Sequence, residues 1–240
     1  MIYLLFLFAI LTFVFTMLGG YFAYKKQDKL HLIISFSAGV LLTAAFLDIL
    51  PESFEMRGGD IKIILLAAIA GFLIYHLVER LSILPTCHEG ECENVLHNHR
   101  AGRLAAASLV FHSLLDGVII GLAFQAGMKL GILVGIAVIA HDWTDGVGVV
   151  AVLLPSGRKW KEMFWWVLVD AITPVIGVFI YFVSFQPNIL SLGLAVVAGI
   201  FIYISASNML PEAHHRHSSI PTILATLAGF MLIFLLGRLI

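Results

Sequence analysis

The stretch HSLLDGVIIGLAFQAGMKLGILVGIAVIAHDWTDG, residues 112–146, contains the motif His-x-x-x-Asp-Gly twice, once at each end. The apolar sequence between the two copies is interrupted by Gly127-Met128-Lys129, which predicts a short turn between two helices. In an antiparallel hairpin folded at this turn, both motifs lie about 18–20 Å from it, because a helix rises ~1.5 Å per residue. The stretch therefore predicts two neighbouring helices that bring both motifs to one depth.

The rest of the chain is as apolar as this hairpin. Of its 240 residues, 60% are hydrophobic and 12% are charged, whereas about 25% of the residues in a soluble domain are charged. A helix that crosses a membrane needs about 20 apolar residues. Eight stretches are long enough: roughly 2–24, 31–50, 61–80, 104–125, 131–154, 162–184, 188–209 and 220–238. We therefore expect an all-α membrane protein with eight transmembrane helices, in which the hairpin supplies spans 4 and 5.

We expect residues 1–240 to form a single transmembrane domain. The first span has no basic start and no small-residue cleavage site, so we expect it to be retained and not removed as a signal peptide. One polar loop, residues 81–103, separates spans 3 and 4. Its cysteines and histidines, within residues 87–99, either bind zinc as a sensor or reservoir or are simply solvated. The formal net charge of −1 gives no argument for a nucleic-acid partner.

Lysine and arginine residues predict the orientation of the spans, because they concentrate in cytoplasmic loops. Ten of them lie near the loops after spans 1, 3, 5 and 7, and four lie on the opposite side. The ten are Lys25, Lys26, Lys29, Arg80, Arg100, Arg103, Arg158, Lys159, Lys161 and Arg216, and the four are Arg57, Lys62, Lys129 and Arg238. We therefore expect a plasma-membrane protein with both termini outside and the 81–103 loop in the cytoplasm.

Spans 2 and 7 contain similar sequences. Residues 38–53 read AGVLLTAAFLDILPES and residues 198–213 read AGIFIYISASNMLPEA, so that Ala-Gly and Leu-Pro-Glu recur at the same spacing. The two spans are five crossings apart and therefore run in opposite directions. This pattern indicates an inverted repeat, which many secondary transporters use for alternating access.

The predicted spans contain aspartates but no lysine or arginine well inside them. These aspartates are Asp48, Asp116, Asp142, Asp145 and Asp170. A charged aspartate at the bilayer centre costs about 2.5–3.5 kcal/mol on insertion scales. Several of them without a basic partner require a source of positive charge, either protons or a metal cation.

The two motifs favour a metal. Positions four residues apart share a helix face, so His112 faces the same way as Asp116, and His141 the same way as Asp145. We call these four residues the His/Asp cluster. Its two carboxylates and two neutral imidazoles suit a divalent cation, either tetrahedral zinc or iron(II), manganese(II), cobalt(II) or cadmium(II). The alternative is hydrogen bonding between helices, which averages only about 0.6 kcal/mol in one membrane protein.

Other polar positions have open roles. Asp142 follows His141 and lies about 100° further around the helix, where it either lines the pathway or bonds a neighbouring helix. Asp48 and Glu52 on span 2 lie near the predicted outer mouth, where they attract cations, or Glu52 is simply solvated. On span 7, the equivalent positions and the histidines after them could receive a released ion: Asn208, Glu212, His214, His215 and His217.

Glycine and proline residues predict how the spans pack. Gly117 with Gly121 on span 4, and Gly131 with Gly135 on span 5, are pairs of small residues that let helices approach closely. Pro174 is expected to interrupt span 6 and to free backbone carbonyl groups there.

These features together resemble the ZIP (Zrt/Irt-like) family of divalent metal transporters over essentially the whole chain. The family pattern is His-Ser/Asn-x-x-Asp/Glu-Gly on span 4 and His/Gln-x-x-x-Asp/Glu on span 5, with Leu-Pro-Glu on span 2 as here. The resemblance implies that the His/Asp cluster is the principal metal site. It also implies an inverted 3+2+3 arrangement of the helices, import toward the cytoplasm and a homodimer.

The resemblance further implies that Ser113 and Asp142 line a second metal site beside the first. Members with this second site also have a glutamate before a proline on span 6. This chain has Thr173 before Pro174 instead. We therefore expect one strong metal site with a weak or absent neighbour.

Three functions are compatible with the sequence. The first is a secondary transporter that carries zinc or a related divalent cation toward the cytoplasm through the His/Asp cluster. The second is an intramembrane metallo-hydrolase that uses the same residues catalytically, although the zinc-protease motif His-Glu-x-x-His is absent. The third is a receptor that binds the metal without transporting it. Metal flux in sealed liposomes distinguishes the first from the other two.

Overall fold

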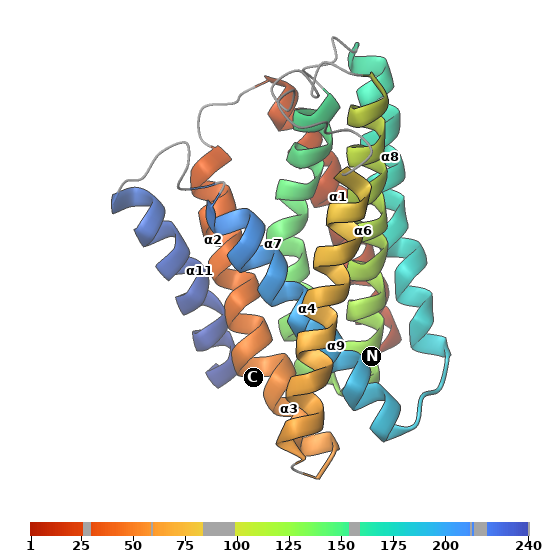
Figure 1. Ribbon diagram of the computed structural model, residues 1–240, viewed down its shortest axis with the longest axis vertical. Coiled ribbons are helices and arrows are strands. Elements are labelled where there is room, and N and C mark those ends of the chain that lie inside the picture. The colour runs from red at the N-terminus through yellow and green to blue at the C-terminus, as the bar shows by residue number, and fades with distance from the viewer. Residues whose placement is uncertain are drawn as a thin grey trace.

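The computed structural model describes residues 1–25, 30–58, 60–83, 99–153, 159–211, 213 and 220–239. Within these residues nearly all of the chain is helical, with no strand, and eight helices are long and apolar enough to cross a membrane (Figure 1). The prediction of an all-α membrane protein with eight spans is confirmed. The spans form one upright bundle.

The helices, in chain order, have the following bounds. They are α1 (Ile2–Lys25), α2 (Leu30–Thr43), α3 (Leu50–Met56), α4 (Ile61–Ile83), α6 (His99–Ala126), α7 (Met128–Leu153), α8 (Trp160–Gly177), α9 (Pro187–Tyr203) and α11 (Ile220–Leu239). Three further segments continue the helices before them. They are the π-helices η1 (Ala44–Ile49) and η5 (Ile204–Met209) and the 3₁₀-helix η4 (Val178–Phe182).

Two predicted connections are shorter than the sequence indicated. Helix α7 begins at Met128, so only Gly127 separates it from α6, and the predicted three-residue turn is wrong. Helix α4 continues to Ile83 and α6 begins at His99, so both ends of the predicted 81–103 loop are helical. Hydropathy predicts which residues lie inside the membrane. A helix can continue beyond them, because its backbone hydrogen bonds do not end at the membrane surface. Residues 84–98 lie outside the described residues.

Span 6 is not broken at Pro174, contrary to the prediction. Helix α8 continues through Pro174 to Gly177 and then tightens into η4. The side-chain amide of Gln125, near the end of α6, donates to the carbonyl oxygens of Ile180 and Tyr181 at 2.9 and 3.1 Å. These backbone groups are therefore bonded by a neighbouring helix. The carbonyl group that Pro174 itself frees is that of Asp170, and it accepts from the hydroxyl of Thr173 at 2.8 Å.

Glycines bring the helices together in four pairs, which we divide into two groups: α1–α7 with α6–α8, and α2–α11 with α4–α9. In the first group, α1, α6, α7 and α8, a Cβ atom built on Gly117 would lie 2.1 Å from the carbonyl oxygen of Pro174. In the second group, α2, α4, α9 and α11, a Cβ atom on Gly39 would lie 2.1 Å from the carbonyl oxygen of Thr226. Of the described glycines, none places its own backbone against the backbone of a helix from the other group. The predicted close approach at Gly117 is confirmed, and it joins α6 to α8.

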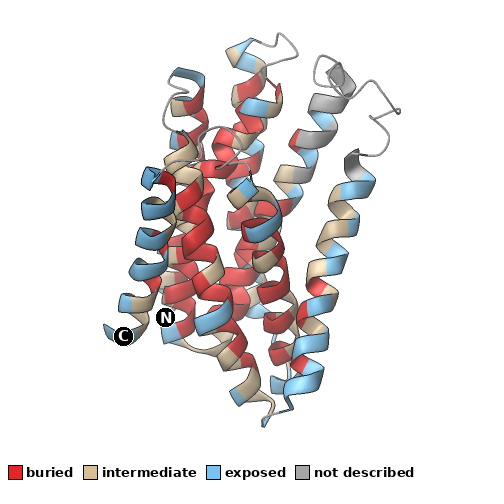
Figure 2. Ribbon diagram, turned by 60° about the vertical axis from the view of Figure 1, so that its left-hand side comes forward, coloured by how far each residue is buried: buried red, intermediate tan, exposed pale blue. Residues whose placement is uncertain are grey.

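The buried residues lie along the middle of the bundle, as Figure 2 shows in red. Within their membrane-crossing windows, 61% of α7 and 67% of the α9 span are buried, against 17% of both α4 and α11. Helices α7 and α9 are therefore central, and α4 and α11 present most of their surface outward.

The two π-helical segments occupy matching positions in spans 2 and 7. Each end of η5 lies 160 residues after the corresponding end of η1. The same offset separates the two similar sequences, residues 38–53 and 198–213. A π-helical turn inserts an extra residue into a helix and often occurs at functional sites.

Candidate metal site

The His/Asp cluster comes together between α6 and α7. His112 and Asp116 lie one turn apart on α6, and His141 and Asp145 lie one turn apart on α7. One ligand atom from each residue can be chosen so that all four atoms lie within 4.8 Å of one another. All four side chains are buried, and the most exposed residue, Asp145, shows 7% of its surface. The hairpin therefore brings both motifs to the same depth.

The distances within the cluster suit a small cation. The Nε2 atom of His112 lies 3.4 Å from Asp116 Oδ2 and 3.7 Å from Asp145 Oδ2. The Nε2 atom of His141 lies 3.4 and 3.6 Å from the same two oxygens. Neighbouring ligand atoms around a tetrahedral zinc ion, with bonds of about 2.0–2.1 Å, are about 3.3–3.4 Å apart. The four nitrogen–oxygen distances in the cluster are therefore within a few tenths of an ångström of those around such an ion.

Hydrogen bonding does not account for the cluster. Both oxygens of Asp116, Nε2 of His141 and Oδ2 of Asp145 are buried without a hydrogen-bond partner in the described part of the chain. Leaving a buried polar atom unpaired costs about 1–3 kcal/mol, and more for a charged group. His112 and His141 approach the aspartates of the opposite helix at 3.7 and 3.4 Å, but hydrogen bonds among the described residues leave these atoms unsatisfied. A cation between the four atoms would satisfy all of them.

Asp142 lies beside the cluster but is not one of its four members. Its Oδ1 atom is 4.0 Å from Nε2 of His141, and the residue is only 1% exposed. Neither of its carboxylate oxygens has a hydrogen-bond partner among the described residues. The side chain is therefore a buried acceptor whose oxygens are available to a cation.

Ser113 has a partner that the sequence did not identify. Its hydroxyl group donates to Oδ1 of Asp170, on α8, at 2.8 Å, and both residues are buried. The hydroxyl of Thr173 donates to the carbonyl oxygens of Val110 and Asp170 at 3.2 and 2.8 Å. The buried acid that α8 contributes next to the metal-site helix is thus Asp170. Its position as a lone acid in an apolar span was the only signal for it.

Asp48 and Glu52 are not members of the four-ligand group. Asp48 lies in η1 and Glu52 in the first turn of α3, and both are half-buried. The Oδ2 atom of Asp48 is buried without a hydrogen-bond partner within the described ranges. A Cβ atom on Gly237 of α11 would lie 3.3 Å from its Oδ1 atom. The carboxylate of Asp48 therefore faces the end of α11.

Several predicted residues lie outside the described residues. They are the cysteines and histidines at positions 87–97, together with Glu212, His214, His215 and His217. For His99, at the first position of α6, only the backbone is described.

Comparison with known proteins gives a consistent family. A family model described as ZIP zinc transporter matches residues 86–237. Zinc transporter ZIP10 of Homo sapiens is 38% identical over 106 residues, which cover 43% of this chain and 13% of the human protein. Zinc transporter YKE4 of Saccharomyces cerevisiae is 27% identical over 229 residues, 82% of this chain and 65% of the yeast protein. Zinc transporter ZupT of Corynebacterium aurimucosum is 26% identical over 237 residues, 89% of this chain and 88% of that protein.

The length of the match differs between these relatives. The chain spans only 13% of the human protein, but most of the bacterial one.

Proposed function

Because the chain belongs to the ZIP zinc transporter family, we propose that it is a secondary transporter that carries zinc, or a related divalent cation, across the membrane. The transported ion would bind His112, Asp116, His141 and Asp145. The observation that supports this most strongly is the approach of two buried imidazole nitrogens to two buried carboxylate oxygens between α6 and α7, at 3.4–3.7 Å. Iron(II), manganese(II), cobalt(II) and cadmium(II) are the other candidate cargoes.

Transport is favoured over the two alternatives. The family and the relatives above are named as zinc transporters, which are not enzymes. A catalytic zinc commonly has three protein ligands and an open position for water, whereas the His/Asp cluster offers four ligands. No contact in the described residues favours a hydrolase or a receptor that binds without transport.

We propose import toward the cytoplasm, with residues 1–240 as one domain in the plasma membrane and both termini outside. The excess of lysine and arginine on one side supports this orientation. A homodimer is proposed from the family resemblance. The outward surfaces of α4 and α11 offer apolar area for lipid or for a second copy.

We also propose that the eight spans form an inverted repeat. Contacts in the second helix group support it. Gly39 of α2 approaches the Thr226 carbonyl of α11, and Gly199 of α9 approaches the Ala68 carbonyl of α4. Gly199 follows Gly39 by 160 residues, and Thr226 follows Ala68 by 158. The contact of span 2 with span 8 therefore corresponds to the contact of span 7 with span 3 when span 2 is matched with span 7 and span 3 with span 8.

The first helix group follows the same rule. Gly19 of α1 approaches the Trp143 carbonyl of α7, and Gly177 of α8 approaches the Leu114 carbonyl of α6. Gly177 follows Gly19 by 158 residues, and Trp143 follows Leu114 by 29, which is also the spacing of the two His-Asp motifs. These contacts exchange when span 1 is matched with span 6 and span 4 with span 5. The 3+2+3 arrangement requires the same matching.

The remaining predicted residues have supporting roles in this proposal. Asp142 lies close enough to His141 to form part of a weak neighbouring site, and Ser113, bonded to Asp170, orients the α8 carboxylate beside it. Asp48 and Glu52, at the end of span 2 that carries fewer lysines and arginines, would attract cations to the outer mouth.

Uptake of radiolabelled zinc into proteoliposomes tests the function. We expect uptake by the unmodified chain and loss of it in Asp116→Ala and His141→Ala, with competition by iron, manganese and cadmium. Asp60→Asn is the matched control, because Asp60 is exposed and lies outside the cluster. Unchanged uptake in both cluster variants would remove the His/Asp cluster from the mechanism.

A further inference from the structure

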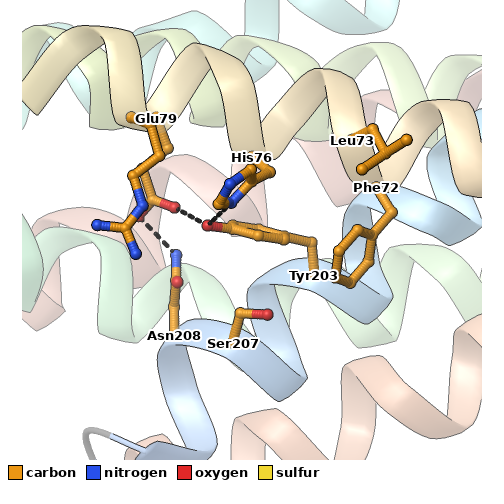
Figure 3. A pocket seen from close by; sticks show the side chains of 8 residues that line it. Phe72, Leu73, His76, Glu79, Tyr203, Ser207 and Asn208 are labelled. Atoms are coloured by element: carbon orange, nitrogen blue, oxygen red, sulfur yellow. Dashed lines mark hydrogen bonds between the residues drawn. The ribbon is translucent and has the colours of Figure 1, made fainter.

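A separate polar pocket lies between α4 and the end of the α9 span. It has a volume of about 430 Å³ and is lined by His76 and Glu79 from α4 and by Tyr203, Ser207 and Asn208 from α9 and η5. Figure 3 shows these side chains pointing toward one another across the gap between the two helices. We call it the α4–α9 pocket.

Glu79 is held in this pocket by neutral groups. The hydroxyl of Tyr203 donates to Oε2 of Glu79 at 2.5 Å, and the side-chain amide of Asn208 donates to Oε1 at 2.9 Å (Figure 3). Arg80 also lines the pocket, but within the described residues Glu79 forms no ion pair. The carboxylate therefore accepts hydrogen bonds from two neutral donors and has no ion pair within 4.0 Å in the described part of the chain, although the guanidinium of Arg80 belongs to the same pocket.

His76 offers a free ring nitrogen on the same face of α4. Its Nδ1 atom lies 3.1 Å from the hydroxyl oxygen of Tyr203. Because that hydroxyl gives its only proton to Glu79, it accepts from Nδ1 of His76, and in the neutral ring the Nε2 atom then keeps its lone pair. Residues three apart on a helix are neighbours. The pocket thus combines an imidazole nitrogen and a carboxylate, both common zinc ligands.

Aromatic rings connect this pocket to the His/Asp cluster. The ring of His112 meets the ring of Tyr75 edge-on, with centroids 5.7 Å apart, and Tyr75 lies 5.5 Å from the ring of Tyr203. Glu79 follows Tyr75 by four residues, so it lies about 6 Å further toward the end of α4. That end of α4, at Ile83, is on the side with more lysine and arginine residues. The rings of Tyr75 and Tyr203 therefore lie between the His/Asp cluster and the pocket, in contact with each other and with His112.

We propose that the α4–α9 pocket is a second cation station. In it, Nε2 of His76 and the carboxylate of Glu79 bind a divalent cation that has left the His/Asp cluster past Tyr75 and Tyr203. One carboxylate holds such an ion less strongly than the two of the cluster, because the Coulomb attraction scales with the charge. A second site with lower affinity, between the His/Asp cluster and the lysine- and arginine-rich side of the bundle, would favour release of the cation. This inference rests on the proposed function for the source of the cation.

Equilibrium binding of radiolabelled cadmium to the full chain in nanodiscs tests it. The background is Asp116→Ala with His141→Ala, which disables the cluster. In this background we expect Glu79→Gln and His76→Gln each to weaken the binding of one ion by more than about tenfold, since even an outer-shell partner is worth 10–100-fold. Ions bound by the loop cysteines and histidines form a constant baseline in all variants.

Two variants separate a cation station from a structural hydrogen-bond network. Tyr203→Phe removes the donor to Glu79 but leaves both ligands, so cadmium binding should persist or become tighter. Asp60→Asn, an exposed carboxylate at the opposite end of α4, should have no effect. Binding that is insensitive to Glu79→Gln and His76→Gln would overturn the inference, and so would equal loss in Tyr203→Phe.

The outcomes also distinguish this inference from the proposed function. If the background variants bind as many ions as the unmodified chain, the His/Asp cluster fails as a metal site. The dependence on Glu79 can still be scored in that case. If only the cluster-dependent ion exists, the proposed function stands and the second station is wrong.

Discussion

The Nδ1 atom of His141 lies 3.2 Å from the carbonyl oxygen of Ala137, one turn earlier on α7. A donated hydrogen bond there fixes the ring and leaves Nε2 of His141 without a proton, directed at Asp116 and Asp145. The Nδ1 atom of His112, in contrast, has no hydrogen-bond partner in the described part of the chain. The two imidazoles of the cluster are therefore not equivalent.

We expect His141→Ala to weaken zinc binding more than His112→Ala. His141 is already ordered by Ala137, so it loses less side-chain freedom when the metal binds. Each substitution should raise the dissociation constant by about tenfold or more, the lower limit for loss of an outer-shell partner. Titration of both variants in nanodiscs measures this, and a larger loss in His112→Ala would contradict it.

Asp116→Asn should separate metal binding from folding. Oδ2 of Asp116 lies 3.4 Å from both imidazole Nε2 atoms, so its charge is shared by the whole cluster. Without zinc, the amide removes a buried unpaired charge, and the thermal unfolding temperature should stay equal or rise. At a zinc concentration 100 times its dissociation constant the unmodified chain gains about 2.7 kcal/mol, which the variant should lose. Asp60→Asn is the control that should keep the full gain.

Gly117→Ala should destabilise the fold, because the new Cβ atom would lie 2.1 Å from the carbonyl oxygen of Pro174. Overpacking of this kind typically costs about 1–3 kcal/mol. Gly127→Ala is the matched control, since no atom lies within 4 Å of its added Cβ. Thermal unfolding in detergent should distinguish the two variants, and equal unfolding temperatures would argue against the close contact of α6 with α8.

Ser113→Ala should lower the free energy of unfolding, because the buried carboxylate of Asp170 on α8 loses its hydrogen-bond donor. Without the hydroxyl, neither oxygen of Asp170 has a side-chain donor among the described residues, which costs about 1–3 kcal/mol. Asp170→Asn should recover much of that loss in the double variant, with a coupling energy of about 0.5–3 kcal/mol. Additive effects in this double-mutant cycle would mean that the two side chains do not interact.

Cysteine labelling tests the orientation of the spans. Cys87 and Cys92 are first replaced by serine, and then Asp60→Cys and Lys159→Cys are made separately. Both positions are exposed and lie at opposite ends of the bundle, one before α4 and one before α8. A reagent that cannot cross membranes should label Asp60→Cys in intact cells and Lys159→Cys only after permeabilisation. The reverse labelling pattern would mean that the orientation is the opposite of the proposed one.

The spans and the sharing of a face by His112 and Asp116 were predictable, because both follow from local properties. Twenty apolar residues span a bilayer, and a period of about 3.6 residues places positions i and i+4 together. The prediction of the hairpin needed one further local feature, the short connection at Gly127. The errors at this connection, at the 81–103 loop and at Pro174 concern helix ends. There, backbone bonding and packing against neighbouring helices override hydropathy.

Outside the hairpin, the sequence did not determine which side chains meet across helices. Ser113 reaches Asp170 over 57 residues of chain, and Tyr203 reaches Glu79 over 124. Such contacts depend on the rotation and depth of each helix relative to its neighbours, and glycine packing at sites such as Gly117 sets both. Only the tertiary structure therefore connects the His/Asp cluster, through Tyr75, to the α4–α9 pocket.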